Sequence, residues 1–206
     1  MTKTNWNPWF GIPVLVFFSV GLWLLARLAY GAEILFWNEY REQPLNTLFK
    51  WATRLGEFSA YAVFVVLLLL LRQYRFALLL SLTGLAVIPV VNVMKNRFQA
   101  PRPIAWFEQQ GKREELVLVP GEKLNRGRTS FPSGHTAGAF ALFTALTFML
   151  PPRMRPLGLP LALLAIACAV SRIFLVQHFL ADVLAGAAIG IGMALISAEF
   201  GMRNAE

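Results

Sequence analysis

The feature that most constrains this chain is a series of apolar runs, each close to the length that crosses a lipid bilayer. A transmembrane helix needs about 20 mostly apolar residues, and the charged residues of this sequence, 15% of the total, gather between the runs. The runs lie at residues 9–30, 58–71, 76–94, 133–151, 157–176 and 179–198. They predict an all-α, polytopic membrane protein with six transmembrane helices, in a single domain that covers residues 1–206.

A polar stretch at residues 33–57 separates the first two runs. Its apolar residues recur at helical spacing and are Leu45, Leu48, Phe49, Ala52 and Leu55. Lys50 and Arg54 fall elsewhere on the same helical wheel. This pattern is typical of an amphipathic helix that lies along the membrane interface.

The short turns between the runs indicate the orientation of the chain. An even number of spans puts both termini on one side, and the basic turns at residues 72–75 and 153–155 share that side with Lys3 and Arg203. By the positive-inside rule this side is cytoplasmic. The long polar loop at residues 95–131 then lies on the opposite side, where its own basic residues violate a naive charge count; a loop whose arginines bind phosphate has a separate reason to be basic.

The long loop is also strongly basic. The chain has a formal net charge of +8, and the basic residues of the loop are Lys95, Arg97, Arg102, Lys112, Arg113, Lys123, Arg126 and Arg128. Such charge can indicate nucleic-acid binding, but no zinc-finger spacing or RNA-binding aromatic motif accompanies it, so we expect no nucleic-acid partner. A site for a phosphorylated ligand at the membrane surface fits better, alongside simple attraction to anionic headgroups.

The first chemically suggestive motif lies where the loop begins. Lys95 and Arg102 are seven residues apart, and the prolines beside Arg102 fix a stiff, extended path after the helix. Together they can bind a phosphate, with Arg102 as a bidentate fork and Lys95 as a point charge. The plain alternative is a basic flank that stops membrane transfer.

The second motif lies where the fourth apolar run begins, at Ser133, Gly134 and His135. Ser133 is a natural N-cap, and Gly134 lets a ligand approach the backbone. The exposed N–H groups of the first helical turn favour an anion, and His135 stands beside that turn. The alternative is an ordinary capped helix with an interfacial histidine.

The third motif lies between the fifth and sixth runs and holds Arg172, His178 and Asp182. His178 and Asp182 are four residues apart, so on a helix they share a face and can hydrogen-bond. A carboxylate on one imidazole nitrogen fixes the tautomer and leaves the other nitrogen as a nucleophile. With six spans, all three motifs open on the same side of the membrane, and we expect them to converge.

The residues of the three motifs also indicate what the site binds. His135, His178 and Asp182 could hold a metal ion. The nearby cations, Lys95, Arg102 and Arg172, would instead repel a divalent ion and bind an oxyanion. Ser133 lacks the GxSxG elbow of a serine hydrolase. We therefore predict an oxyanion pocket with a histidine nucleophile and no metal.

These residues resemble the signature of the type 2 phosphatidic acid phosphatase (PAP2) family. That signature comprises a lysine, six residues and Arg-Pro; then Pro-Ser-Gly-His; then Ser-Arg, five residues, His, three residues and Asp. The sequence carries all three parts without departure, as Lys95…Arg102-Pro103, Pro132-Ser133-Gly134-His135 and Ser171-Arg172…His178…Asp182. The resemblance covers about residues 95–182, and the first third of the chain matches only in being hydrophobic with an interfacial stretch.

The resemblance implies a metal-independent lipid phosphatase without a cofactor, whose site lies on the periplasmic or outer face. His178 is expected to attack phosphorus and become phosphorylated, while Asp182 orients it. His135 is expected to protonate the leaving oxygen and then to activate water. The residues expected to bind the phosphate oxygens are Lys95, Arg102, Ser133, Gly134 and Arg172.

The leaving lipid is left open by the sequence. An isoprenyl diphosphate such as undecaprenyl diphosphate, phosphatidylglycerol phosphate, phosphatidic acid and lipid A 1-phosphate all fit the same pocket. One alternative is a phosphotransferase that passes phosphate from an isoprenyl diphosphate to lipid A, and another is a non-catalytic phospholipid binder or transporter. The sequence predicts no oligomeric state and no role for residues 104–129.

Overall fold

The computed structural model describes the backbone of residues 6–203 and the side chains of residues 6–199. Within this range the chain is helical and has no β-strand. The longer helices are α1 (Pro8–Arg27), α3 (Leu45–Ala52), α4 (Phe58–Leu70), α5 (Tyr74–Phe98), α7 (Gly134–Met149), α8 (Gly158–Phe174) and α9 (Leu180–Arg203). The shorter ones are α2 (Ala32–Leu35), α6 (Pro103–Gln109) and the 3-10 turns η1 (Asn38–Tyr40), η2 (Thr53–Gly56), η3 (Arg113–Glu115) and η4 (Pro152–Leu157).

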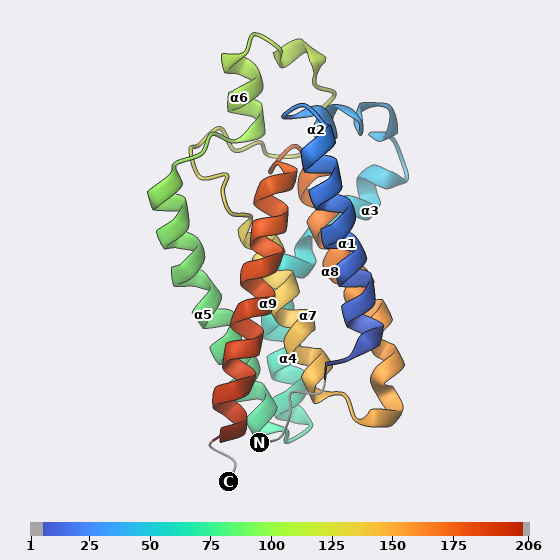
Figure 1. Ribbon diagram of the computed structural model, residues 1–206, viewed down its shortest axis with the longest axis vertical. Helices are drawn as coiled ribbons and strands as arrows, with labels where there is room; N and C mark the ends of the chain where they lie inside the picture. The colour runs from blue at the N-terminus through green and yellow to red at the C-terminus, as the bar shows by residue number, and fades with distance from the viewer. Residues whose placement is uncertain (1–5, 204–206) are drawn as a thin grey trace.

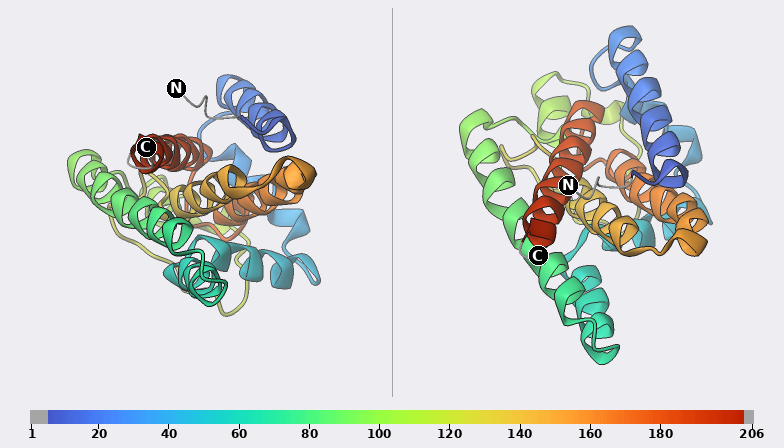
Figure 2. Two further views of the ribbon diagram at one scale, coloured as in Figure 1. Left: turned by 90° about the horizontal axis from the view of Figure 1, so that it is seen from below. Right: turned by 60° about the horizontal axis from the view of Figure 1, so that its bottom comes forward.

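The helices form a bundle with α7 at its centre (Figures 1 and 2). α7 packs against α5, α8 and α9, and every residue from Thr136 to Ala145 is buried. α9 lies closest because small residues face α7. A Cβ added at Gly186 or Gly190 would lie 2.4 Å from Ser133 O or 2.3 Å from Ala137 O, so the two backbones touch only because these positions are glycine.

Four helical segments of the described chain are long and apolar enough to cross a membrane: Pro8–Arg27, Tyr74–Gln109, Pro152–Phe174 and Leu180–Glu199. A fifth candidate is the pair Leu45–Gly56 and Phe58–Leu70, which is bent by 61°. α7 is not among them, because its 16 residues reach only about 24 Å at a rise of about 1.5 Å per residue. An all-helical protein with several candidate spans is therefore confirmed for the described chain, whereas six spans are not.

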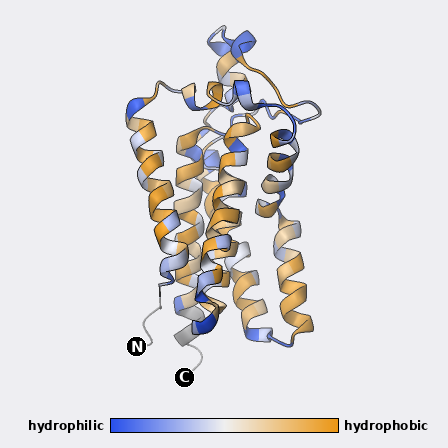
Figure 3. Cartoon of the chain, turned by 90° about the vertical axis from the view of Figure 1, so that its right-hand side faces the viewer, coloured by the Kyte–Doolittle hydropathy of each residue, from blue (hydrophilic) through white to orange (hydrophobic). Residues whose placement is uncertain are grey.

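The outer surface of the bundle suits lipid. Leu15 on α1, Val63 on α4 and Leu85 on α5 are all well exposed. Hydrophobic residues dominate the long helices, and hydrophilic ones gather at their ends and in the connecting segments (Figure 3). Apolar side chains on the outside of a bundle are stable where the surrounding solvent is hydrocarbon.

The polar stretch after α1 folds onto the protein. α3 packs against α8, with the ring centroids of Phe49 and Phe174 4.4 Å apart, and Ala52 is buried beside them. Leu48 and Trp51 on the same helix are exposed. The predicted amphipathic helix thus exists over residues 45–52, but its predicted position along the membrane interface is not confirmed.

The two ends of the bundle differ. α1 begins and α9 ends at the lower end in Figure 1, where the turn between α4 and α5 and the η4 segment also lie. α5 ends toward the opposite end, where α6 and η3 occupy the predicted loop; the sequence did not predict these two elements. Lys3, which the positive-inside argument also uses, lies outside the described residues.

Candidate active site

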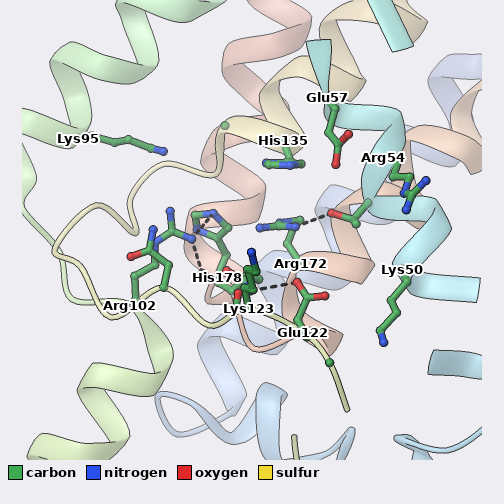
Figure 4. A pocket seen from close by; sticks show the side chains of 15 residues that line it. Lys50, Arg54, Glu57, Lys95, Arg102, Glu122, Lys123, His135, Arg172 and His178 are labelled. Atoms are coloured by element: carbon green, nitrogen blue, oxygen red, sulfur yellow. Dashed lines mark hydrogen bonds between the residues drawn. The ribbon is translucent and has the colours of Figure 1, made fainter. Parts of the chain in front are cut away.

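The three sequence motifs meet at one cavity of about 590 Å³ near the upper end of the bundle (Figure 4). Its wall includes six of the eight predicted site residues, namely Lys95, Arg102, Gly134, His135, Arg172 and His178. They come from the end of α5, the segment before α6, the start of α7, the end of α8 and the turn before α9. The predicted convergence of the three motifs is therefore observed.

A tight turn between α8 and α9 carries His178. The backbone N–H groups of Gln177 and His178 both donate to Arg172 O, at 2.9 and 3.1 Å. Val176 has a left-handed φ of 57°, which is unusual for a β-branched residue. The turn folds the chain back so that His178 lies beside the end of α8 and is 1% exposed.

The Asp182 carboxylate contacts the imidazole ring of His178 on its Nδ1 side. Asp182 Oδ2 lies 3.4 Å from His178 Nδ1 and accepts hydrogen bonds from Ser130 Oγ at 2.5 Å and from the Phe179 N–H at 3.0 Å. The sequence predicts His178 and Asp182 on one helical face, but α9 begins at Leu180, so His178 precedes the helix and the turn makes the contact. A proton held on Nδ1 leaves the lone pair on Nε2, the nitrogen that lies near Arg102 Nη1.

The surroundings of His178 favour its neutral form. Burial, followed by the positive charges of Arg102, Arg172 and Lys95, lowers the pKa of His178 well below its usual range. Only the unprotonated imidazole has a lone pair with which to attack phosphorus. The setting of His178 thus favours the protonation state that the predicted nucleophile requires.

Two buried arginines flank the histidine. Arg102 Nη1 lies 3.3 Å from His178 Nε2 and donates to Gln177 O at 3.0 Å. Arg172 Nη1 donates to Thr53 Oγ1. The Nε of each arginine is buried without a hydrogen-bond partner in the described chain. Buried guanidinium groups are stable only when an anion compensates them, so this pair suits a bound oxyanion.

The start of α7 completes the wall of the cavity. Ser133 is the N-cap, and its Oγ accepts from the Thr136 N–H at 3.4 Å. A Cβ added at Gly134 would lie 3.7 Å from Lys95 Nζ, so the ammonium group approaches this backbone closely. Gly134 lines the cavity and fits a phosphate contact. Ser133 is fully buried, and its hydroxyl serves the cap, which leaves its predicted phosphate contact untested.

Several residues that contact the site were not predicted from the sequence. Ser130 reaches Asp182, Thr53 reaches Arg172, and Gln177 joins Arg102 to the loop by donating from Nε2 to Lys123 O at 2.9 Å. The only sequence signal was position, since Ser130 lies two residues before Pro132 of the second motif and Gln177 lies within the third motif, just before His178. Thr53 lies 119 residues from Arg172, so no local pattern could have revealed it.

The charges at the site favour an anion over a metal ion. Among the described residues, no group of three or more His, Cys, Asp and Glu side chains is placed to hold a metal. His135, Arg172 and His178 instead lie around one space, with Arg102 beside His178 and Lys95 on the same side as Arg102 (Figure 4). Hydrogen-bond donors of positive charge stabilise a phosphoryl group in its transition state.

The sequence matches a family model, the PAP2 superfamily, over residues 74–205. This is more than half of the chain and includes all three motifs. The chain belongs to the PAP2 superfamily. The matched part begins with α5, so α1 to α4 lie outside it.

The chain also resembles individual proteins of known name. The chain is 28% identical over 141 residues to the undecaprenyl-diphosphatase BcrC of Bacillus subtilis (strain 168), a match that covers 65% of this chain and 66% of BcrC, just under two thirds of that relative. The crystal structure of Aquifex aeolicus LpxE is similar with a TM-score of 0.65 and 26% identity, over 84% of this chain and 97% of that chain.

A further solved structure has a similar fold, and because its sequence identity is low, it supports the fold alone. It is the first transmembrane PAP2-type phosphatidylglycerolphosphate phosphatase from Bacillus subtilis, with a TM-score of 0.68 and 20% identity, over 95% of this chain and 97% of that chain. Several long apolar helices and the family match together support a multi-pass membrane protein of the PAP2 superfamily.

Proposed function

We propose that this protein is a membrane lipid phosphatase that hydrolyses a lipid phosphate or diphosphate through a phosphohistidine intermediate. The observation that carries the proposal is the setting of His178. Its Nδ1 faces Asp182, its Nε2 lies 3.3 Å from Arg102 Nη1, and both arginines of the site are buried around it. A nucleophile is thereby combined with a phosphate-binding pocket.

In the first step His178 Nε2 attacks the phosphorus atom, and the bond between phosphorus and the leaving lipid oxygen breaks. His135 donates a proton to that oxygen, so the lipid leaves as a neutral hydroxyl or a protonated phosphate. Asp182 stabilises the positive imidazole that forms. Lys95, Arg102 and Arg172 bind the phosphoryl oxygens, together with the N–H of Gly134 and, by the family resemblance, Ser133.

In the second step water attacks the phosphohistidine. His135, now unprotonated, accepts a proton from the water, and the bond between phosphorus and His178 Nε2 breaks. Inorganic phosphate leaves, and both histidines return to their starting states. The same residue acts first as acid and then as base, so a single histidine serves both half-reactions.

A second cavity supports a lipid as the leaving group. It measures about 460 Å³ and lies between α4, α5 and α7, where apolar side chains such as Tyr61, Val65 and Ile88 line it. It shares Glu57 and Gly134 with the phosphate cavity. A lipid whose phosphate reaches His178 can therefore leave its apolar chain in this groove, open toward the bilayer.

The relatives narrow the substrate class to lipid phosphates and diphosphates. BcrC is an undecaprenyl-diphosphatase, and the Bacillus subtilis structure is a phosphatidylglycerolphosphate phosphatase. The same class includes phosphatidic acid and lipid A 1-phosphate. Each of these substrates offers a phosphate at the membrane surface.

We also propose six membrane spans, with α4 and α7 as the two short ones and the active site on the periplasmic side of a bacterial inner membrane. α7 is shorter than the hydrocarbon core of about 30 Å, but it is surrounded by other helices rather than lipid. The basic turns at residues 72–75 and 153–155 lie at the opposite end from the site, which the positive-inside rule assigns to the cytoplasm.

The test is phosphate release by the purified full chain in detergent from a panel of these lipids, with and without EDTA. We expect release from at least one lipid, no effect of EDTA, and an acid-labile phosphoenzyme that His178→Ala abolishes. Release that EDTA abolishes would contradict the metal-free mechanism. Phosphate that reaches lipid A but never water would favour the phosphotransferase, and a fully active His178→Ala protein would contradict the nucleophile.

A further inference from the structure

The active-site cavity has a second group of cations that the PAP2 signature does not include. Lys50 at the end of α3, Arg54 in η2 and Lys123 in the loop line its wall. Lys50 and Arg54 lie across His178 and Arg172 from Lys95 (Figure 4). Both also lie outside the residues that match the family model, so they are a feature of this chain beyond the shared signature.

Lys50 and Arg54 have donors to spare. Within the described chain neither forms a salt bridge. Lys50 Nζ donates one hydrogen bond, to Pro120 O at 2.5 Å, and an ammonium group has three N–H bonds. The Arg54 guanidinium carbon lies 4.3 Å from the centre of the Trp51 ring, and stacking on a ring face leaves the N–H groups at the guanidinium edge free.

The position of this cation pair is fixed relative to the phosphate site. Lys50 and Arg54 are four residues apart, so they share a face of the continuous α3–η2 segment. Thr53, between them, accepts the hydrogen bond from Arg172 Nη1. The wall that carries the pair is therefore joined directly to an arginine of the phosphate site.

The carboxylates at this end of the cavity do not neutralise the pair. Glu122 accepts from Gln177 Nε2 at 3.2 Å, so it is already engaged. Glu57 lies beside His135 in Figure 4 and also lines the apolar groove. Three cations and two carboxylates thus line this part of the cavity, which leaves it positive.

We propose that Lys50 and Arg54 form a second anion subsite, which binds a phosphate of the leaving group while Lys95, Arg102 and Arg172 hold the phosphate under attack. This inference rests on the proposed lipid phosphatase function. The substrate is then a lipid with two phosphates: a diphosphate, or a phosphomonoester whose headgroup also contains a phosphodiester. A lipid with one phosphate, such as phosphatidic acid, has no group for the subsite.

The test compares three substrates with the purified full chain: an isoprenyl diphosphate, phosphatidylglycerol phosphate and phosphatidic acid. Loss of two charge-assisted hydrogen bonds in Lys50→Gln/Arg54→Gln is expected to lower kcat/KM at least about tenfold for a lipid with two phosphates. For phosphatidic acid we expect a change within about twofold, since removal of exposed charges alone has small effects. The control is Arg113→Gln, which removes one positive charge from η3, outside the cavity.

The pattern across substrates separates the outcomes. A selective loss on the isoprenyl diphosphate places the second phosphate directly beside the scissile bond, and a selective loss on phosphatidylglycerol phosphate places it one headgroup away; either supports the subsite. An equal loss on all three lipids would overturn it and indicate general attraction of anionic lipids. If the wild-type chain releases phosphate from no lipid, the proposed function itself fails.

A second measurement does not depend on lipid turnover. The affinity of each protein for inorganic diphosphate is compared with its affinity for orthophosphate. Thermal unfolding of each variant checks that the fold is retained. We expect the wild-type chain to bind diphosphate at least about tenfold more tightly than orthophosphate if the two phosphates are adjacent, and the double variant to lose that preference. A preference that survives in the folded double variant would contradict a diphosphate at this subsite.

Discussion

Ser130 Oγ donates a hydrogen bond of 2.5 Å to Asp182 Oδ2, the same oxygen that lies 3.4 Å from His178 Nδ1. The Ser130 N–H also donates to Ala100 O at 3.0 Å, two residues before Arg102. One fully buried serine therefore connects the carboxylate beside the proposed nucleophile with the backbone segment that leads to Arg102, a proposed phosphate ligand.

Ser130→Ala is expected to lower kcat about 10- to 100-fold, the effect of removing one hydrogen bond to a buried charged group. KM should change little, because Ser130 does not line the cavity. The measurement is steady-state kinetics on the preferred lipid, with the rate of phosphoenzyme formation as a second readout.

Thr83→Val is the matched control for this variant. Thr83 is fully buried on α5, and its Oγ1 bonds only to Leu79 O, so its loss removes a hydroxyl away from the site. A Ser130→Ala protein with normal kcat and raised KM would show that Ser130 does not position the nucleophile.

His135 and His178 are expected to fail at different steps. His178→Gln should form no phosphoenzyme from any substrate. His135→Gln should still react with p-nitrophenyl phosphate, whose leaving group needs no proton, and should then accumulate phosphohistidine because water is not activated. Rapid-quench measurement of nitrophenol and of acid-labile phosphate tests both. Steady turnover of this ester by His135→Gln would mean that another group serves as the base.

The pH dependence follows from the lowered pKa of His178. Burial and the cations around His178 favour the neutral imidazole. The acidic limb of the profile, which is the fall of kcat/KM at acidic pH that reflects protonation of His178, should therefore lie below a pH of about 6.5, the ordinary pKa of histidine. Arg102→Gln removes one of these charges, which raises the pKa of His178 and moves the limb to higher pH, besides lowering the rate.

A comparison between variants on one substrate cancels the titration of the substrate itself. Lys112→Gln, which removes an exposed charge paired with Glu115, is the control and should leave the limb in place. A limb that does not move in Arg102→Gln would indicate that it reports a group other than His178.

The sequence predicted the convergence of the motifs better than the number of spans. Lys95, Arg102, His135, Arg172 and His178 were singled out because phosphate chemistry needs particular side chains at short spacing, and all five line one cavity. Their roles in catalysis stay predictions. The sequence did not predict the residues that hydrogen-bond to the motif side chains. Thr53 and Ser130 are partners by tertiary contact: Thr53 lies 119 residues from Arg172, and Ser130, although close to the second motif, contacts Asp182 of the third motif 52 residues away.

The fold was predicted in outline because long apolar runs in a bilayer must be helical. The number of spans was harder, because α7 is shielded by protein and need not match the thickness of lipid. Likewise, α3 has the amphipathic pattern of an interfacial helix, yet Phe49 packs on Phe174. An apolar face turned to protein or to lipid gives the same pattern in the sequence.

Gly190 and Gly192 on α9 give a matched test of helix packing. A Cβ at position 190 would lie 2.3 Å from Ala137 O, whereas nothing lies within 4 Å of one at position 192. Gly190→Ala should therefore separate α9 from α7 and cost about 1–3 kcal/mol. Gly192→Ala should be neutral or add up to about 1 kcal/mol through helix propensity.

Thermal unfolding of the purified variants in one detergent compares the two. The expected order of apparent Tm is Gly192→Ala at or above the wild-type chain, and Gly190→Ala below it. Equal stability of the two variants would mean that α9 does not pack this closely on α7.

The proposed orientation is tested by two engineered cysteines in intact bacterial cells. Cys168, the one natural cysteine, is fully buried, so labelling of the unmodified chain should be weak. Glu114→Cys, in η3 on the side of the active site, should react with a maleimide that cannot cross the inner membrane. Arg153→Cys, in the basic turn at the other end, should react only after the membrane is permeabilised, because the positive-inside rule places this turn in the cytoplasm. The reverse pattern would put the active site on the cytoplasmic face, where it would act on lipids of the inner leaflet.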